Sequence, residues 1–181
     1  MRTAPSLVPI EHLNALDAAA FERALRPLFE RAGPLADALF LARPFASYPA
    51  LLDAADALAR ELPDEQKVAI LNGHPRIGEN ADVVREASAL AYAEQGFVSE
   101  QDATAADLAR VYADLARLNA AYEARFGFRF LVFVNGRPKA AIREVLQTRL
   151  ERSRAAELAT ALADLVAIAR DRLTVLSNAA R

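Results

Sequence analysis

Only one stretch of the chain has the character of a β-strand, and this restricts the fold more than any other feature. The run FRFLVFVN (128–135) is aromatic and β-branched, and Gly127 and the turn sequence NGRP bound it. A single strand of this length cannot form a stable sheet, so we expect a buried extended segment. The remaining residues must then fold as helices. The sequence therefore predicts an all-α, single-domain helical bundle over residues 1–181, with one short extended segment near 128–135.

Prolines and helical periodicity divide the rest of the chain. Between residues 104 and 126, apolar side chains recur every three or four positions, and Gly127 is placed to end this helix. Pro27 should end or kink the first helix, and Pro63 should be the first residue of another. The expected helices cover about 17–31, a short stretch after Pro34, Pro49 to about Leu62, a segment from Pro63, and about 81–95, 104–126, 138–151 and 154–177.

The charge balance and the missing residue types exclude several classes of protein. The 22 basic and 24 acidic residues are spread along the chain, and the net charge of −2 creates no field that attracts nucleic acid or an anionic membrane. The absence of cysteine removes disulfides, thiolate nucleophiles and Cys-based metal sites, and two distant histidines do not form a His-rich site. We therefore expect no metal. The N-terminus lacks a long apolar run, so we expect a cytoplasmic protein.

His74, one of the two histidines, lies in the sequence GHPRIGEN (73–80) between two expected helices. Because proline disfavours the α conformation of the residue before it, Pro75 should hold His74 on an extended stretch. A histidine fixed in this way is a common general acid or base at neutral pH. The spacing alone is more typical of a simple His-Pro turn, and both interpretations stay open.

Glu94 comes at the end of an apolar helix face formed by Val84, Ala87, Leu90 and Ala91. A carboxylate at this position is either a surface group whose stem covers apolar neighbours, or a partly buried group that needs a partner. The neighbouring Gln95 adds an amide that can both donate and accept hydrogen bonds.

Arg172 lies in the middle of an apolar seam on the last expected helix. Leu165 and Ile168 precede it by seven and four positions, and Val175 and Leu176 follow it by three and four. Arginine is rarely buried without a carboxylate, so Arg172 should pair with an internal acid or bind an anionic ligand. A stem that packs on the core with its guanidinium in water is the third interpretation.

Taken together, five sequence motifs resemble one family. The chain is similar to the 2-oxo-4-hydroxy-4-carboxy-5-ureidoimidazoline (OHCU) decarboxylases, which act at the end of the pathway from uric acid to (S)-allantoin. The resemblance implies an all-helical, cofactor-free and usually dimeric enzyme with a small-molecule ureidoimidazoline substrate. The motifs are ARPFASYPALLDAAD (42–56), HPRIGE (74–79), EQG (94–96), LNAAYEARFGFRFLVFVNGR (118–137) and ELATALADLVAIARDRL (157–173).

The resemblance also assigns roles to individual residues. It implies that His74, Glu94 and Arg172 are the catalytic residues, with His74 as the proton carrier. It further implies a substrate-binding set in which the backbone of 130–134 hydrogen-bonds the ligand. This set comprises Pro75, Ala91, Gln95, Phe130, Leu131, Val132, Phe133 and Val134.

One position departs from the family pattern. The family has S-x-x-E-Q where this chain has AYAEQ, so Ala91 replaces a serine whose hydroxyl would bond the ligand. Ser88, one helical turn away, would reach the ligand differently if it substituted. Two alternatives to the decarboxylase therefore stay open. The chain is either a paralogue that acts on a related ureido acid, or a non-catalytic ureide-binding or helical interaction module.

Overall fold

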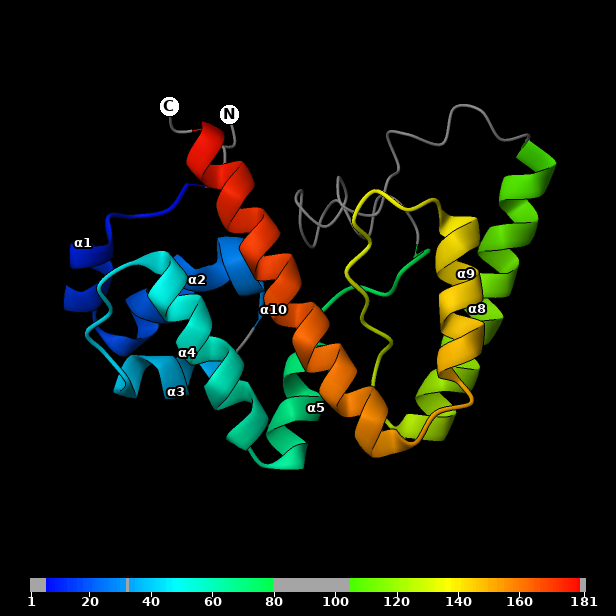
Figure 1. The fold of residues 1–181 in the computed structure, drawn as a ribbon, viewed down its shortest axis with the longest axis horizontal. Coiled ribbons are helices and arrows are strands. Elements are labelled where there is room, and N and C mark those ends of the chain that lie inside the picture. Colours follow the sequence, from blue (N-terminus) through cyan, green and yellow to red (C-terminus); the bar gives the residue numbers. More distant parts are fainter. Residues whose placement is uncertain (1–5, 32, 80–104, 180–181) are drawn as a thin grey trace. The chain divides into compact units, whose positions relative to one another are not determined.

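The computed structural model of the chain describes residues 6–31, 33–79 and 105–179, and within these ranges all regular secondary structure is helical. The expected all-α class is therefore confirmed. The helices, labelled in Figure 1, are α1 (Ile10–Ala15), α2 (Ala18–Phe29), α3 (Gly33–Leu41), α4 (Tyr48–Glu61), α5 (Asp64–Asn72), α8 (Ala105–Phe126), α9 (Lys139–Arg149) and α10 (Arg154–Ala179).

The chain forms two compact units. The terminal unit comprises Met1–Gly73 with Leu162–Arg181, and the central unit comprises His74–Ala161. Helix α10 begins in the central unit and continues as part of the terminal unit. The sequence predicts that residues 1–181 form a single domain. Whether the two units together form that domain stays a prediction.

In the terminal unit, side chains cap the starts of two helices, α2 and α4. A side-chain oxygen of Asp17 accepts a hydrogen bond of 2.8 Å from the backbone N–H of Ala20 and caps α2. Ser47 caps α4 in the same way. Helix α3 packs against α2, α4 and α5 (Figure 1). The apolar side chains that these helices share form the core of this unit, and they include Leu13, Phe21, Leu25, Leu28, Leu35, Leu39, Leu51 and Leu52.

The central unit is organised around α8 and α9, which lie side by side in Figure 1. Leu115, Leu118 and Tyr122 on α8 are buried, as are Ile142 and Leu146 on α9. The spacing of the α8 side chains is the helical period that the sequence contains, so one face of the helix supplies the core of the unit.

The β-like run is buried but pairs with no strand within the described residues. Gly127, with a φ of 80°, ends α8 in the left-handed conformation that glycine adopts at no steric cost. The rings of Phe128 and Phe130 then pack edge-to-face on Tyr122, with centroid distances of 5.7 and 5.2 Å. Aromatic packing replaces the hydrogen bonds of a sheet as the constraint on this segment.

Three details differ from the sequence expectations. Helix α1 was not expected, because a helix of six residues is too short to show a period. Pro63 and Pro138 precede their helices and are not the first helical residue of either, since both have extended ψ angles near 150°. Pro27 lies inside α2, and the helix ends soon after it, at Phe29. The helix expected over about 81–95 lies outside the described residues.

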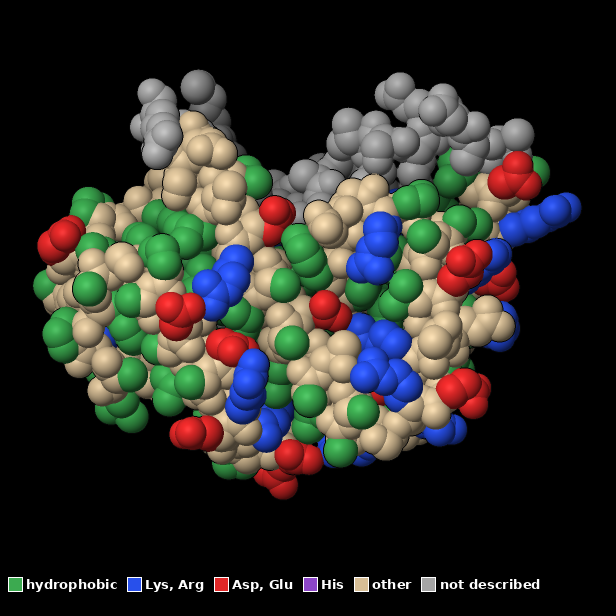
Figure 2. Space-filling view, viewed as in Figure 1, with side chains coloured by type: hydrophobic (Ala, Val, Ile, Leu, Met, Phe, Trp, Pro, Cys, Tyr) green, Lys and Arg blue, Asp and Glu red, His purple; other side chains and the backbone are tan. Residues whose placement is uncertain are grey.

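The surface carries charges of both signs. Figure 2 shows acidic and basic side chains interspersed on the face in view. Among the described residues, no helix combines the length and the apolar character needed to cross a membrane.

Candidate active site

His74 is a buried residue. It follows the end of α5 and is only 3% exposed. Its backbone carbonyl accepts a hydrogen bond of 2.7 Å from Nη1 of Arg129. A histidine in a simple surface turn would keep its ring in water, so the burial excludes a solvent-exposed turn, and the chemical role of the ring stays a prediction.

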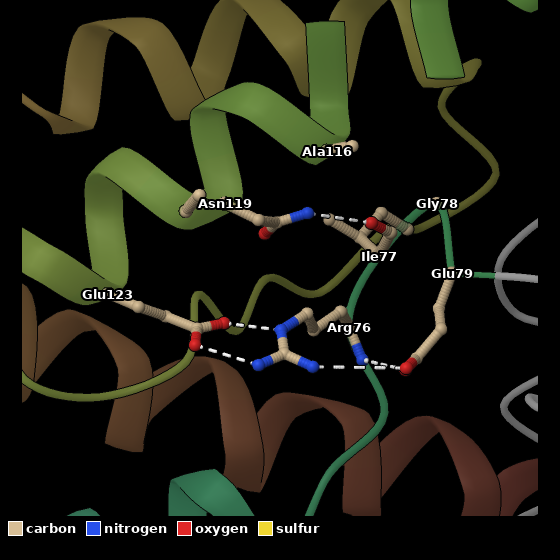
Figure 3. A pocket seen from close by; sticks show the side chains of 8 residues that line it. Arg76, Ile77, Gly78, Glu79, Ala116, Asn119 and Glu123 are labelled. Atoms are coloured by element: carbon tan, nitrogen blue, oxygen red, sulfur yellow. Dashed lines mark hydrogen bonds and ion pairs between the residues drawn. The ribbon is translucent and has the colours of Figure 1, made fainter. Parts of the chain in front are cut away.

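The residues after His74 are fastened to α8, as Figure 3 shows. Arg76 makes a two-pronged ion pair with Glu123, with Nε–Oε1 and Nη2–Oε2 distances of 2.5 and 2.8 Å. Asn119 donates a hydrogen bond of 2.9 Å from Nδ2 to the carbonyl of Ile77. These two contacts join a loop to a helix more than 40 positions away, so they restrict the loop to one conformation.

Gly78 allows this close approach of the loop to α8. Its φ of 74° lies in the left-handed region, and a Cβ atom at this position would lie 2.9 Å from Cδ1 of Leu115. Both the backbone conformation and the lack of space therefore require glycine.

The ion pair changes the protonation equilibria of both partners. The hydrogen bond from Arg76 lowers the pKa of Glu123, and burial opposes this effect only in part. The same hydrogen bond raises the pKa of Arg76. Both groups are therefore charged at neutral pH, as a stable loop anchor requires.

A hollow of about 310 Å³ lies between this loop and α8 (Figure 3). Its charged groups are paired with one another: Arg76 lies between Glu123 and Glu79, whose carboxylate accepts a hydrogen bond of 3.0 Å from the Arg76 backbone N–H. His74, Pro75 and residues 130–134 do not line the hollow. Its walls therefore support the loop and are separate from the expected substrate-binding residues.

Residues 130–134 are held by arginine side chains. Nη1 of Arg149 donates to the carbonyl of Leu131 at 3.1 Å, and the Arg149 guanidinium lies 4.8 Å from the ring centroid of Phe130. Arg137 donates to the carbonyls of Phe133 and Val134. The side chains of Phe130, Leu131, Val132 and Val134 are buried, and Phe133 is half-buried.

A buried carboxylate organises the arginine behind this segment. Glu157 is fully buried and accepts hydrogen bonds from Nε of Arg149 at 2.6 Å and from the hydroxyl of Tyr122 at 2.8 Å. Arg152 lies 3.1 Å from its second oxygen. Burial, followed by the bond to Glu157, raises the pKa of Tyr122, so its hydroxyl stays a donor. The cluster fixes Arg149 beneath Leu131 and Phe130.

Arg172 belongs to the terminal unit and has an acidic partner. It is 2% exposed, its Nη2 lies 2.8 Å from Oε1 of Glu30, and its Nη1 donates to the carbonyl of Leu28 at 3.2 Å. Of the interpretations open from the sequence, pairing with an internal acid is confirmed, and exposure of the guanidinium to water is wrong. Glu30 ends α2 with a φ of 58°, an uncommon conformation for a residue other than glycine.

Three expected site residues, Ala91, Glu94 and Gln95, lie outside the described residues. Pro75 is half-buried next to His74. Within the described ranges, no group of three or more His, Asp or Glu side chains is placed to hold a metal ion. The structure thus brings His74 and the 130–134 segment together through Arg129, which directly precedes Phe130.

Comparison with known proteins identifies the family of the chain. The OHCU decarboxylase family model matches residues 14–174, which is most of the chain. The chain belongs to the OHCU decarboxylase family. A 2-oxo-4-hydroxy-4-carboxy-5-ureidoimidazoline decarboxylase of Halalkalicoccus jeotgali is 26% identical over 172 residues, covering 93% of this chain and 91% of that protein.

Two further known proteins are similar to this chain of the OHCU decarboxylase family. The uric acid degradation bifunctional protein PucL of Bacillus subtilis is 30% identical over 168 residues, which are 91% of this chain but only 32% of PucL. A crystal structure of OHCU decarboxylase in the presence of (S)-allantoin aligns with a TM-score of 0.61 and 20% identity, over 81% of this chain and 92% of that chain. The last comparison shows a shared fold.

Several residues that contact the expected site residues within each unit were not singled out from the sequence. Glu123 and Glu157 resemble ordinary helix charges, and Arg129 resembles an outward-facing residue of an alternating run. Glu30 stands at a helix end, where its partner Arg172 is 142 positions away. The one feature of the sequence that could have indicated these residues is that each is a charged residue within or beside a run of apolar residues.

Proposed function

We propose that the chain decarboxylates 2-oxo-4-hydroxy-4-carboxy-5-ureidoimidazoline to (S)-allantoin in uric acid degradation, without a cofactor. The observation that carries this proposal is the match of the family model over residues 14–174. The burial of His74 and the attachment of its loop to α8 support the proposal, because a proton carrier needs a side chain with little freedom to move.

The structure of the substrate explains why the proposed decarboxylation needs no cofactor. The substrate carboxylate is attached to a ring carbon next to a C=N bond, so the electron pair left by departing CO₂ moves into the ring. The protein has to supply a fixed geometry, donors where negative charge develops, and one proton delivered to one face. Delivery to one face gives a single enantiomer of allantoin.

The roles follow from these needs. His74 carries the proton, and Glu94 orients its imidazole or the substrate. Pro75 and Gln95 line the ligand, and backbone groups of residues 130–134 recognise its flat, ureide-like edge. Rigid support of this segment by Arg149 favours such a role, because recognition by backbone groups needs a fixed backbone.

Arg172 holds a carbonyl or carboxylate oxygen of the ligand in this proposal. Its pairing with Glu30 offsets the guanidinium charge and fixes the orientation of the side chain. The substrate then meets a preorganised hydrogen-bond donor and not a mobile cation.

We further propose that the chain works in the cytoplasm as a homodimer. The dimer rests on the family resemblance, and the cytoplasmic location on the composition of the chain. Light scattering coupled to size-exclusion chromatography tests the dimer, since a mass near 19.6 kDa at micromolar concentration would contradict it.

A coupled assay tests the activity. Urate oxidase and hydroxyisourate hydrolase generate the unstable substrate in place, and circular dichroism follows the allantoin that forms. Adding the protein should speed the loss of substrate and yield (S)-allantoin. An unchanged rate and a racemic product at micromolar protein would reject the proposal.

The alanine at position 91 favours a second candidate, a related ureido acid as substrate. Ala91→Ser restores the family's hydroxyl and should add one hydrogen bond of about 0.5–1.5 kcal/mol to the family substrate, raising kcat/KM up to roughly tenfold. A fall in kcat/KM would indicate that the alanine is fitted to another molecule, which a screen of ureido acids would then identify. Binding of such acids without turnover would instead favour a ureide-binding module.

A further inference from the structure

We propose that Arg129 is a positioning residue that ties the proton-carrying His74 to the 130–134 recognition segment. The inference rests on the proposed function for the reaction that His74 performs, but the contact itself is independent of it. Arg129 occupies the variable position of the motif FGFRF, so neither the family resemblance nor the comparisons assign it a role.

The contact acts on His74 itself. The guanidinium of Arg129 reaches across 55 positions of sequence and donates from Nη1 to the His74 carbonyl at 2.7 Å. A charged donor makes a shorter and stronger hydrogen bond than a neutral amide. Because the carbonyl and the side chain of His74 share one Cα atom, fixing the carbonyl restricts where the imidazole can point.

Arg129 has a rigid base. The residues on either side, Phe128 and Phe130, are 1% and 2% exposed, and both rings pack edge-to-face on Tyr122. Arg149 lies against the ring of Phe130 and bonds the next carbonyl, while Glu157 holds Arg149. The backbone of residue 129 is therefore fixed, and the hydrogen bond from its side chain restricts the position of His74.

The rest of the loop has anchors of its own. Arg76 is bound to Glu123, Ile77 to Asn119, and Gly78 packs against Leu115. Loss of the Arg129 contact should leave these anchors and the fold in place. It should free only the start of the loop, where the imidazole is attached.

The expected effect is therefore on the chemical step. The recognition segment keeps its own support, so substrate binding should change little, whereas the proton donor would no longer be held at one distance from the ligand. A displacement of about 1 Å at a reacting group costs up to about a hundredfold in rate. Proton delivery to both faces would also lower the enantiomeric purity of the allantoin.

The test compares three variants of the full chain. Arg129→Met keeps an unbranched apolar stem without the donor, Arg129→Lys keeps a charged donor, and Arg125→Met is the matched control, an exposed arginine near the end of α8. We expect Arg129→Met to lower kcat by about tenfold or more with KM within about threefold of wild type. Arg129→Lys should retain most of kcat, and Arg125→Met all of it.

A second readout needs no activity. The chain has two histidines, and His12 is exposed on α1, so NMR of isotope-labelled histidine side chains gives one probe and one internal reference. In Arg129→Met the imidazole signals of His74 should shift or broaden, while those of His12 stay unchanged. If the wild-type chain lacks decarboxylase activity, the proposed function fails, and these signals still decide whether Arg129 holds His74.

Two results would overturn the proposal. The first is an Arg129→Met variant with wild-type kcat and unchanged His74 signals. The second is a loss of kcat that is equal in the Met and Lys variants and follows their loss of unfolding free energy, which would reduce Arg129 to a general structural role.

Discussion

Arg172 and Glu30 form a buried ion pair in the terminal unit, with 2.8 Å between Nη2 and Oε1 and side chains that are 2% and 8% exposed. Removing one partner of such a pair leaves an uncompensated charge in the interior. Arg172→Leu should therefore lower the free energy of unfolding by about 3 kcal/mol or more, measured by urea denaturation.

The double variant Glu30→Leu/Arg172→Leu is the control for this prediction. It removes both charges and puts apolar side chains in their place, so it should recover much of the lost stability. A single Arg172→Leu variant as stable as wild type would mean that Glu30 reaches water without its partner.

The Arg172–Glu30 pair also shows what a sequence can and cannot reveal about such a site. The burial of Arg172 follows from the apolar residues around it in one helix, and the period of that helix is visible in the sequence. The identity of its partner does not follow, because contacts between distant elements leave no periodic trace. The same limit applies to Arg129 and His74, which are 55 positions apart.

The sequence predicted a helix well where the helix is long enough to repeat its apolar pattern several times. Helix α8, expected over about 104–126, spans Ala105–Phe126, because 22 residues give the pattern many repeats and Gly127 ends it. The segment around 128–135 was predicted as buried from its composition, and most of its apolar side chains are buried. Its support by Arg149, Glu157 and Tyr122 was not, since each of these looks like an ordinary residue of its own helix.

Gly78 provides a test of the loop anchor. Gly78→Ala would force a side chain into the left-handed region and bring its Cβ to 2.9 Å from Leu115. Gly127→Ala is the matched control, because its φ is also positive but nothing lies within 4 Å of the added Cβ. Gly78→Ala should lose about 1–3 kcal/mol more unfolding free energy than Gly127→Ala. Equal losses would show that Leu115 moves aside freely.

His74 is the residue on which the proposed reaction depends most. His74→Asn keeps a polar side chain of similar reach but removes the group that carries a proton near neutral pH. We expect kcat to fall by about a hundredfold or more, while helical circular dichroism and affinity for allantoin are retained. His12→Asn, in an exposed position on α1, should leave kcat unchanged. Near wild-type kcat in His74→Asn would reduce the His-Pro sequence to a turn.

The Arg76–Glu123 pair predicts how the stability of the central unit depends on pH. The hydrogen bond from Arg76 lowers the pKa of Glu123 in the folded chain below the ordinary value of a glutamate side chain. The unfolded chain therefore binds a proton at a higher pH than the folded chain does. The stabilisation from this carboxylate is fully present above the unfolded pKa, and it is lost as the pH falls through the folded pKa.

Glu123→Gln isolates this contribution because glutamine does not titrate. The unfolding free energy of wild type minus that of Glu123→Gln should stay constant from pH 7 to about pH 5.5 and shrink steadily below pH 4.5, measured by urea denaturation at each pH. Glu151→Gln, an exposed position just after α9, is the control, and its difference from wild type should stay small throughout. A Glu123→Gln difference that is flat down to pH 3 would mean that the carboxylate and Arg76 do not interact in solution.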